Sequence, residues 1–413
     1  MSKFIQRYLE KAVKDICFAY NKMVLISGPR QCGKTTMAKH LLQQRNTGQY
    51  YNWDETTFRR LWAKDPQALV TQLSGKHSKK PLLVLDEIHK DKLWKRSLKG
   101  LYDTSDGKYD ILVTGSARLN VYRKGGDSLL GRYYHFRLHP FSLAELSRSL
   151  TEVSHKNLLD HLFIVGIVRN KSQQEYLELL DQFGPFPEPL FAKNRKILNL
   201  WQRGRVEKIV REDLRDLSWL PELSQVETLV LLLPERAANI LSLRSLSEDL
   251  GVAYTTVKLW MSYLYELYYV FKIQPYFKSL PRSLKKDSKL YLWDWSEIDN
   301  EAARFENMIA SHLLKYCNYL TDTGEGDFNL CYLRNKQQKE IDFLIVKDGK
   351  PWLPIEVKLH DHKLSDNWSI FMKYLPCERA IQVVKPANIY RIEDTHFGKI
   401  LIISAAQFLG CLV

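Results

Sequence analysis

Apolar residues occur in short continuous runs near the start of the chain, separated by longer stretches in which they recur at helical spacing. The runs Met23–Ser27, Leu82–Leu85 and Ile111–Thr114 consist mostly of leucine, isoleucine and valine. Continuous apolar runs of this length are typical of strands that are buried on both faces of a parallel sheet. Residues 1–150 are therefore predicted to form an α/β domain in which helices flank a parallel sheet.

The pattern becomes mostly helical in the middle of the chain and then returns to α/β. Residues 151–200 predict a helical lid or linker, interrupted by the proline-rich stretch Gly184–Pro189. Residues 201–289 carry leucine and tyrosine at helical spacing, end in a basic loop, and predict a helical middle domain. Residues 290–413 predict an α/β domain. Its expected elements are the helix Arg304–Leu320 and the strands Leu290–Trp293, Asn329–Leu333, Ile341–Val346 and Pro354–Lys358.

Composition narrows the class of protein. A chain of 413 residues is too long for one core, and 45% hydrophobic with 26% charged residues is ordinary for a globular protein. The net charge of +14 favours a polyanionic partner, and we expect nucleic acid, specifically DNA. The cysteines are scattered without a CxxC pair, and no apolar run is long enough for a signal peptide or a membrane span. We therefore expect a cytoplasmic protein with reduced thiols and no membrane partner.

A glycine-rich motif follows the first apolar run and precedes a helical stretch. It fits G-x-x-x-x-G-K-[ST], whose glycines let backbone N–H groups face phosphates at the start of a helix. Lys34 is expected to contact the β- and γ-phosphates of ATP, and the Thr35 hydroxyl is expected to bind Mg²⁺. The predicted nucleotide-binding residues are Gly28, Pro29, Arg30, Gln31, Cys32, Gly33, Lys34, Thr35 and Thr36.

A pair of carboxylates ends the second apolar run. Asp86 and Glu87 follow Leu82–Leu85 directly. In combination with the glycine-rich motif, an apolar strand that ends in Asp-Glu predicts a hydrolytic pair. Asp86 is expected to hold Mg²⁺, and Glu87 is expected to act as the base that polarises the attacking water.

A third run ends in small polar residues, and basic residues follow it. A hydroxyl here could orient the lytic water beside Glu87, with Ser116 the first candidate and Thr114 the second. The alternative is a strand that simply ends in a turn. Arg132 is a candidate arginine finger or sensor for the γ-phosphate charge. The other readings are a solvated arginine at this position, or Arg118 or Arg123 in the same role.

The segment Ser245–Lys258 has helix-turn-helix character. A short helix is expected to end at Gly251, and Thr255 is expected to cap a second helix that runs to about Tyr269. This second helix would read DNA if the segment binds it. Its exposed face offers few basic residues, chiefly Lys258, and it is rich in tyrosine and leucine. A core or interdomain helix is therefore the alternative.

Acidic residues gather in the predicted C-terminal domain. Asp342 starts one apolar strand, and Glu356 and Lys358 lie two residues apart on the next, so their side chains share a face. Two carboxylates and a lysine at such positions could hold Mg²⁺ and activate water against a phosphodiester, with Lys358 as a catalytic residue. Glu306, on the expected helix, could complete the metal site. The alternative is an ordinary solvated strand face.

These segments together resemble a family of prokaryotic AAA-type ATPases that carry a C-terminal domain of restriction-endonuclease-like, PD-(D/E)XK type. The likeness covers nearly the whole chain. The segments that carry it are GPRQCGKTT, LLVLDEIHK, VTGSARLN, LLGRYYHFRLHPFSLAEL, FGPFPEPL, KLYLWD, FENMIASHLLK, KEIDFLIV and IEVK.

The resemblance implies a P-loop NTPase domain, a winged-helix middle domain and a nuclease-like C-terminal domain. It implies ATP and Mg²⁺ as cofactors and a ring-forming or switch-like homo-oligomer. The positions that match the nuclease motif are Glu306, Asp342, Glu356 and Lys358, although Ile341 stands where the motif's name has a proline.

Two functions remain open from the sequence. The first is an enzyme in which ATP turnover drives or licenses Mg²⁺-dependent cleavage of DNA. The second is a nucleotide-dependent switch whose C-terminal domain binds DNA or a partner without cutting it. Convergence of Asp342, Glu356 and Lys358 in an open groove would favour cleavage, whereas their burial or dispersal would favour the switch.

Overall fold

The computed structural model describes residues 5–71, 80–115, 129–147, 158–165, 171–213, 223–276 and 288–413. The chain divides into two compact units, Met1–Pro140 and Phe141–Val413. The division falls before the expected boundary at residue 150. The three segments that the sequence separates, 151–200, 201–289 and 290–413, all lie within the second unit. Each unit is described by itself.

The first unit is built on a five-stranded parallel sheet in the order β2-β3-β4-β1-β5. The three predicted strands are confirmed, whereas β2 and β5 were not predicted from the sequence. Because all strands run in the same direction, their carboxyl ends meet at one edge of the sheet. The strands are β1 (Met23–Ser27), β2 (Gly48–Asn52), β3 (Leu82–Asp86), β4 (Asp110–Gly115) and β5 (Tyr133–Arg137).

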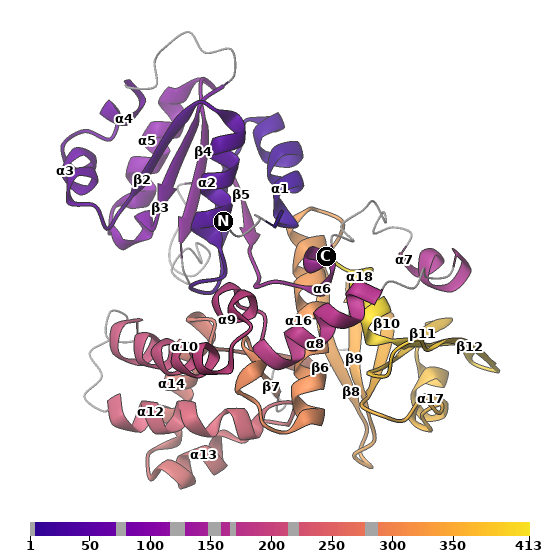
Figure 1. Cartoon of the computed structure of the whole chain (residues 1–413). Coiled ribbons are helices and arrows are strands. Elements are labelled where there is room, and N and C mark those ends of the chain that lie inside the picture. The colour runs from indigo at the N-terminus through magenta and orange to yellow at the C-terminus, as the bar shows by residue number, and fades with distance from the viewer. Residues whose placement is uncertain are drawn as a thin grey trace. The chain divides into compact units, whose positions relative to one another are not determined.

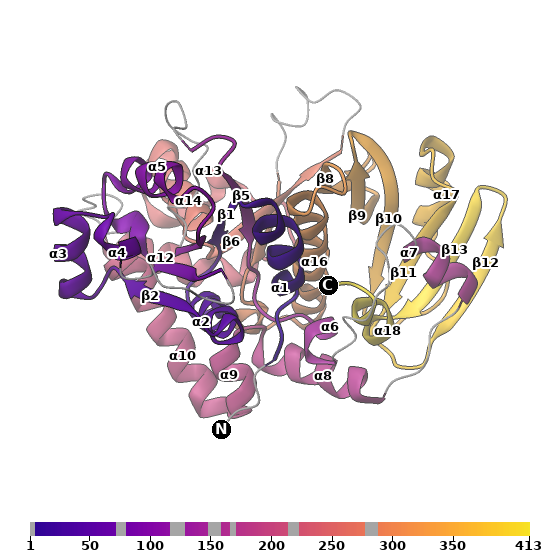
Figure 2. The same cartoon turned by 90° about the horizontal axis from the view of Figure 1, so that it is seen from above.

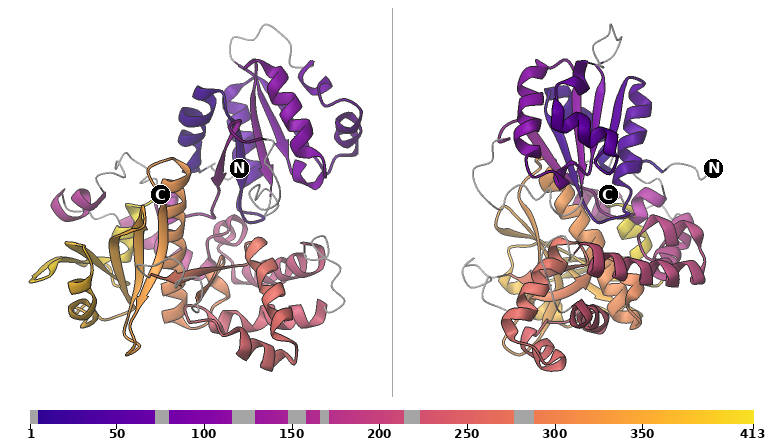
Figure 3. Two further views of the ribbon diagram at one scale, coloured as in Figure 1. Left: turned by 180° about the vertical axis from the view of Figure 1, so that it is seen from behind. Right: turned by 90° about the vertical axis from the view of Figure 1, so that its left-hand side faces the viewer.

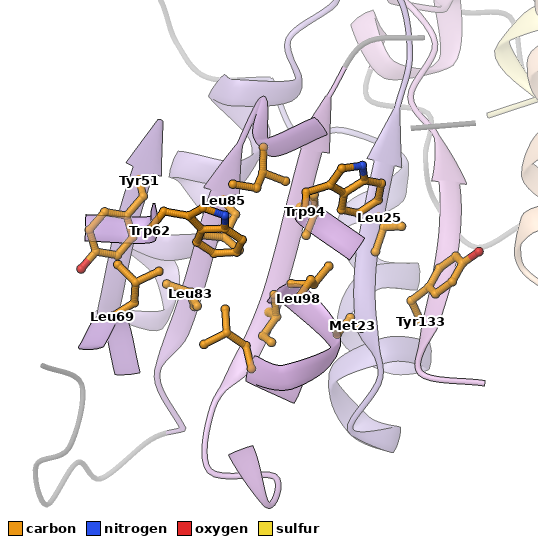
Figure 4. Close-up of a cluster of buried hydrophobic side chains, with 14 of the residues drawn as sticks. Met23, Leu25, Tyr51, Trp62, Leu69, Leu83, Leu85, Trp94, Leu98 and Tyr133 are labelled. Carbon is orange, nitrogen blue, oxygen red and sulfur yellow. The ribbon is translucent and has the colours of Figure 1, made fainter. Parts of the chain in front are cut away.

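Helices flank this sheet, as the sequence predicts (Figure 1, Figure 3). The main core lies where alternate strand residues such as Leu25, Leu83 and Leu85 meet Trp62 and Trp94 (Figure 4). Burial of each such side chain stabilises the fold by roughly 1.5–3 kcal/mol. The helices are α1 (Leu9–Ala12) with its continuation Val13–Cys17 and Phe18–Tyr20, α2 (Lys34–Arg45), α3 (Thr56–Lys64), α4 (Ala68–Thr71), η3 (Ile88–Lys90) and α5 (Trp94–Ser105).

The second unit contains an eight-stranded mixed sheet in the order β12-β13-β11-β10-β9-β8-β6-β7. The strands β8, β9 and β10 form an antiparallel meander, and β10 and β11 are parallel. The predicted strands are confirmed, and the sheet continues across the expected boundary at residue 289. The strands are β6 (Val270–Pro275), β7 (Lys289–Leu292), β8 (Phe328–Arg334), β9 (Glu340–Lys347), β10 (Lys350–Lys358), β11 (Arg379–Val384), β12 (Tyr390–Thr395) and β13 (Gly398–Ser404).

The long helix α16 (Glu301–Asp322) packs against β7, β8 and β10, and α17 (Asn367–Phe371) packs against β9 (Figure 2). The remaining helical segments of this unit are α6 (Leu143–Leu146), α7 (Leu158–Asp160), η6 (His161–Val165), α8 (Lys171–Phe183), α9 (Pro187–Ala192), α10 (Arg195–Glu207), η7 (Lys208–Asp213), α12 (Leu223–Leu232), η8 (Pro234–Arg236), α13 (Leu243–Leu250), α14 (Tyr254–Glu266), η9 (Trp295–Glu297), η10 (Met372–Tyr374) and α18 (Ala405–Gly410).

The expected helix-turn-helix is present as α13 and α14. The helix α13 ends at Leu250, and Gly251, where the helix was expected to end, is its C-cap in a left-handed conformation. The N-cap of α14 is Ala253, so the prediction that Thr255 caps this helix is wrong. The residues Val257, Trp260, Met261 and Leu264 of α14 are buried.

A buried ionic network joins α10 to the turn after β7. The Arg205 guanidinium lies 2.8 Å from Glu297 Oε1 and 3.8 Å from Asp294 Oδ2. The Tyr269 hydroxyl donates to Glu297 Oε2 at 2.5 Å. Burial raises the pKa of Glu297 to about 7, with Arg205 opposing the shift and Asp294 adding to it. Glu297 therefore binds its proton more tightly in the folded protein than in the unfolded chain.

The Glu297 shift predicts that stability falls as pH rises. The proton on Glu297 contributes fully to stability below about pH 4. Its contribution to the free energy of unfolding is lost as pH rises to about 7, by at most about 1.4 kcal/mol per pH unit. Thermal unfolding of the full chain across this range should show a steeper fall for wild type than for Glu297→Gln. Equal slopes in the two proteins would contradict the assignment.

Candidate functional site

The loop between β1 and α2 is shaped by two glycines. A Cβ on Gly28 would lie 2.2 Å from the Leu138 carbonyl oxygen, so only glycine fits there. Gly33 has a φ of 99° and is the N-cap of α2. The backbone N–H groups at the start of α2 have no partners within the helix, and the helix dipole favours negative charge at this end. The loop and helix therefore form a site that can hold a phosphate group.

The side chain of Lys34 packs against the backbone of this loop and is not exposed to solvent. It is buried, and Nζ donates to the carbonyl oxygens of Gly28 and Pro29 at 2.9 and 2.7 Å. The ammonium group is thus held within the concave side of the loop. The structure therefore brings the Lys34 ammonium to the backbone of the glycine-rich loop.

Arg7 is a residue of this site that the sequence analysis missed. Its buried guanidinium donates to the Cys32 carbonyl oxygen at 2.7 Å and to the His139 carbonyl oxygen at 2.6 Å. Arg7 therefore fixes the glycine-rich loop to the segment that follows β5. No local pattern around Arg7 signals these contacts, because both partners lie far away in the sequence.

Asp86, at the end of β3, is the centre of a hydrogen-bond network. Thr35 Oγ1 and the Tyr50 hydroxyl each donate to Asp86 Oδ2 at 2.7 Å, and Thr114 Oγ1 donates to Asp86 Oδ1. The structure therefore brings Thr35 and Asp86 together, as the sequence predicts. Tyr50, on the unpredicted strand β2, was missed. Of the two hydroxyl candidates, Thr114 binds Asp86, whereas Ser116 lies outside the described residues, as do Arg118 and Arg123.

Glu87 follows Asp86 in an uncommon backbone conformation. Its φ is 58°, and its N–H donates to the Thr114 carbonyl oxygen at 2.9 Å. Positive φ in a residue other than glycine is costly and recurs at functional sites. Burial raises the pKa of Glu87, Lys34 opposes the shift, and Asp86 adds to it. A carboxylate with a raised pKa beside the loop can accept a proton from water.

Arg132 lies at the opposite edge of the sheet from the glycine-rich loop. It precedes β5, whose other end, Arg137, pairs with Ser27. At about 3.3 Å per residue, the length of β5 separates Arg132 from the loop by roughly 16 Å. Its guanidinium instead bonds Asp103 at 2.6 and 3.1 Å. Arg132 therefore lies away from the phosphate-binding loop of its own chain, and its role as an arginine finger or sensor stays a prediction.

The C-terminal candidates also converge. Lys358 Nζ lies 2.9 Å from Glu356 Oε1, and Asp342 Oδ2 accepts from the Val357 N–H at 2.8 Å. Glu356 is only 2% exposed. Its Oε1 also accepts from Ser365 and Asn367, whereas its Oε2 is buried without a hydrogen-bond partner. The cluster is thus assembled as predicted, but Glu356 is enclosed.

Lys289 is a member of this cluster that the sequence analysis assigned to a basic loop. It is the first residue of β7 and only 2% exposed, and its Nζ lies 3.2 Å from Glu306, 3.1 Å from Glu340 and 3.9 Å from Asp342. Within the described ranges, no three His, Cys, Asp or Glu side chains are arranged to hold a metal ion. The metal centre expected from Glu306, Asp342 and Glu356 is therefore not found there, because an ammonium group is paired with two of its members.

Burial raises the pKa of Asp342 well above its ordinary value, and Glu306 and Glu356 raise it further. Lys289 and the Val357 amide oppose this shift. Burial lowers the pKa of Lys289, but the facing carboxylates more than offset it, so the net shift is upward. Lys289 is therefore a permanent cation within this cluster.

Comparison with known families identifies three matched segments. Residues 20–147 match the model of an AAA domain, which coincides with the sheet, loop and carboxylates described above. Residues 20–147 are an AAA domain. Residues 173–296 and 302–406 match two further models, each described as a domain of unknown function (DUF8612 and DUF4143). The first unit thus has a P-loop NTPase fold, and the second contains both further domains.

Similar proteins span most of the chain. An uncharacterized protein of Methanocaldococcus jannaschii is 24% identical over 390 residues, which cover 86% of this chain and 78% of that protein. An uncharacterized protein of Mycobacterium tuberculosis is 22% identical over 341 residues, covering 80% and 69%.

Solved structures resemble the chain only distantly. The Aeropyrum pernix ORC1 protein in complex with DNA has a TM-score of 0.32 at 15% identity, covering 73% of this chain and 89% of that one. AMPPCP-bound DnaA from Aquifex aeolicus has a TM-score of 0.29 at 14% identity, covering 62% and 85%. Among the helices that the structure describes, none has the length and apolar character needed to cross a membrane.

The Arg7 contacts predict that this side chain stabilises the glycine-rich loop. Arg7→Met removes two hydrogen bonds from a charged donor, each worth about 1.5–3 kcal/mol. Hydrogen exchange of amides 28–33 should become faster, and the melting temperature should fall. Lys11→Met, at an exposed position of α1, is the matched control and should change neither quantity. Unchanged loop exchange in Arg7→Met would show that Arg7 does not hold the loop.

Proposed function

We propose that the AAA domain binds ATP with Mg²⁺ and hydrolyses it. The observation that carries this proposal is the 2.7 Å hydrogen bond between Thr35 Oγ1 and Asp86 Oδ2 at the end of the glycine-rich loop. A hydroxyl and a carboxylate are the oxygen ligands that Mg²⁺ takes beside a bound triphosphate. The residues present therefore fit this ion, and Thr35 and Asp86 are the groups that would hold it.

The chain's own groups supply the remaining chemistry. Loop N–H groups and Lys34 bind the phosphates, and bound Mg²⁺ neutralises charge that develops on their oxygens. Thr114 and Tyr50 hold the Asp86 carboxylate in one orientation. Glu87 accepts a proton from the attacking water, and its raised pKa makes it a better proton acceptor at neutral pH.

For the second unit, we propose a nucleotide-dependent switch that binds DNA without cutting it. The burial of Glu356 and the pairing of Glu306 and Asp342 with Lys289 favour this function over cleavage. The net charge of +14 favours contact with a polyanion. The elements α12, α13, α14, β6 and β7, with the bridge between Ile240 and Lys289, follow the order of a winged helix. The exposed face of α14 is the surface that would meet DNA.

The chain is also proposed to act as a homo-oligomer. Arg132 is far from the phosphate site of its own chain but lies on the surface of the first unit, where it bonds Asp103. A neighbouring subunit could therefore receive it as an arginine finger. This arrangement corresponds to the ring-forming class to which the sequence bears a resemblance.

The ATPase proposal predicts distinct effects of two substitutions. Lys34→Ala should abolish ATP hydrolysis, because the γ-phosphate loses its charged contact. Glu87→Gln should retain ATP binding and lower turnover by roughly 10²–10⁴-fold, the usual contribution of a general base. The exposed Glu55→Gln is the control and should hydrolyse ATP at the wild-type rate. A wild-type rate in Glu87→Gln would refute the role of Glu87.

The oligomer proposal predicts complementation between two inactive proteins. Arg132→Ala should lower turnover with little loss of ATP binding, since a finger acts on transition-state charge. Mixing Arg132→Ala with Lys34→Ala protein should restore part of the turnover. Asp103→Ala removes the ion pair but leaves Arg132 in place, and it should remain active. Absence of rescue in a mixed oligomer would rule out action between subunits.

The switch proposal is tested by DNA binding and cleavage on one preparation. Binding of fluorescent duplex or single-stranded DNA should weaken as salt rises and should change on addition of ATP. No cleavage is expected with Mg²⁺ or Mn²⁺. Cleavage that is lost in both Asp342→Ala and Lys358→Ala, while ATP hydrolysis persists, would establish a nuclease instead.

A further inference from the structure

We infer that Lys289 supplies from within the chain the positive charge that Glu306, Glu340 and Asp342 require, and that it thereby closes this cluster to divalent cations. This inference deepens the proposed switch function of the second unit and rests on it. It concerns a residue outside the four positions that match the nuclease motif.

The backbone of Lys289 is fixed on both sides. Lys289 pairs with Ile273 in β6 and forms an antiparallel bridge with Ile240. The Tyr332 ring lies 5.7 Å from Nζ and covers another side of the ammonium group. The backbone of Lys289 is therefore held in the sheet, and its side chain is buried beside these carboxylates.

The carboxylate oxygens near Lys289 are already in use. Glu306 Oε1 accepts from Lys289 at 3.2 Å and from the Tyr291 hydroxyl at 2.8 Å. Glu340 bonds Lys289 through Oε1 and faces Arg334 through Oε2 at 3.4 Å. Asp342 presents Oδ1 to Lys289 and Oδ2 to the Val357 N–H. A divalent ion at these oxygens would compete with the ammonium, guanidinium, hydroxyl and amide groups that face them.

Glu356 alone does not supply a replacement site. Its Oε1 is paired with Lys358, and only Oε2 lacks a hydrogen-bond partner. Mg²⁺ in proteins is usually held by one or two carboxylates together with waters. The one unpartnered oxygen of Glu356 is buried, and the Lys358 ammonium lies 2.9 Å from the other oxygen. The acidic cluster is therefore neutralised by lysines and not by a metal.

Lys289 also joins parts of the second unit that are distant in sequence. It begins β7, whereas its partners lie in α16 and β9. In place of a metal, an ammonium group thus links the middle segment to the C-terminal carboxylates. Opening the cluster to a divalent ion would require the Lys289 ammonium to move away from these carboxylates.

The experiment measures Mn²⁺ binding to the full chain without nucleotide, by calorimetry and by thermal shift. The Asp342→Asn variant should bind Mn²⁺ as wild type does, because no ion binds at the cluster. Lys289→Met should melt at a lower temperature, gain a Mn²⁺ site at least tenfold tighter than any in wild type, and be stabilised by Mn²⁺. The double variant Lys289→Met/Asp342→Asn should lose that site, and Lys289→Arg should behave as wild type.

Two results would overturn the inference. One is Mn²⁺ binding by wild type that Asp342→Asn removes. The other is a folded Lys289→Met protein that gains no site. If Lys289→Met does not fold, the comparison of Mn²⁺ binding by wild type and by Asp342→Asn still tests the inference. ATP hydrolysis and DNA cleavage are measured on the same preparations, so that failure of the inference about Lys289 can be told from failure of the proposed function. If wild type cleaves DNA, the switch function is refuted. If wild type binds Mn²⁺ at Asp342 but does not cleave DNA, only the role of Lys289 is refuted.

Discussion

The parallel register of β3, β4 and β1 is the constraint on which the first unit depends. It sets Asp86 opposite Thr114 and places the glycine-rich loop at the same edge of the sheet. A buried carboxylate is costly unless donors surround it, and here the donors come from α2, β2 and β4. The hydroxyls therefore serve two purposes: they make the buried carboxylate stable, and they keep it oriented toward the place where phosphates would bind.

The two carboxylate sites of the chain differ in what neutralises them. Asp86 accepts hydrogen bonds from three neutral hydroxyls, those of Thr35, Tyr50 and Thr114. At the C-terminal cluster, an ion about 4 Å from the Lys289 ammonium would be repelled by about 8 kcal/mol at an effective dielectric constant of 20. This repulsion opposes the attraction of the carboxylates for an ion. We therefore propose that the acidic residues of the first unit take a divalent ion, whereas those of the C-terminal cluster pair with lysine.

Much of this arrangement could be predicted from the sequence, because its signals are local. The glycine-rich loop, the strands around Asp86 and Asp342, and the helix that carries Glu306 all follow from continuous patterns of residues. Contacts that join distant segments could not be predicted. Arg7, Tyr50 and Lys289 lie in stretches with no motif of their own, and each acts through partners that only the fold brings near. The distance of Arg132 from the loop could not be predicted for the same reason: β5 was not predicted, so the end of the sheet at which Arg132 lies was unknown.

The central claim is that Asp86 and Thr35 hold the ion needed for ATP hydrolysis. The most direct test is the Mg²⁺ dependence of ATP hydrolysis by Asp86→Asn, which preserves the shape of the side chain but removes its charge. We expect that Asp86→Asn still binds ATP in the absence of Mg²⁺ but lacks the Mg²⁺-dependent hydrolysis that is expected of wild type. Hydrolysis by Asp86→Asn at the wild-type rate, with the same Mg²⁺ dependence, would contradict it.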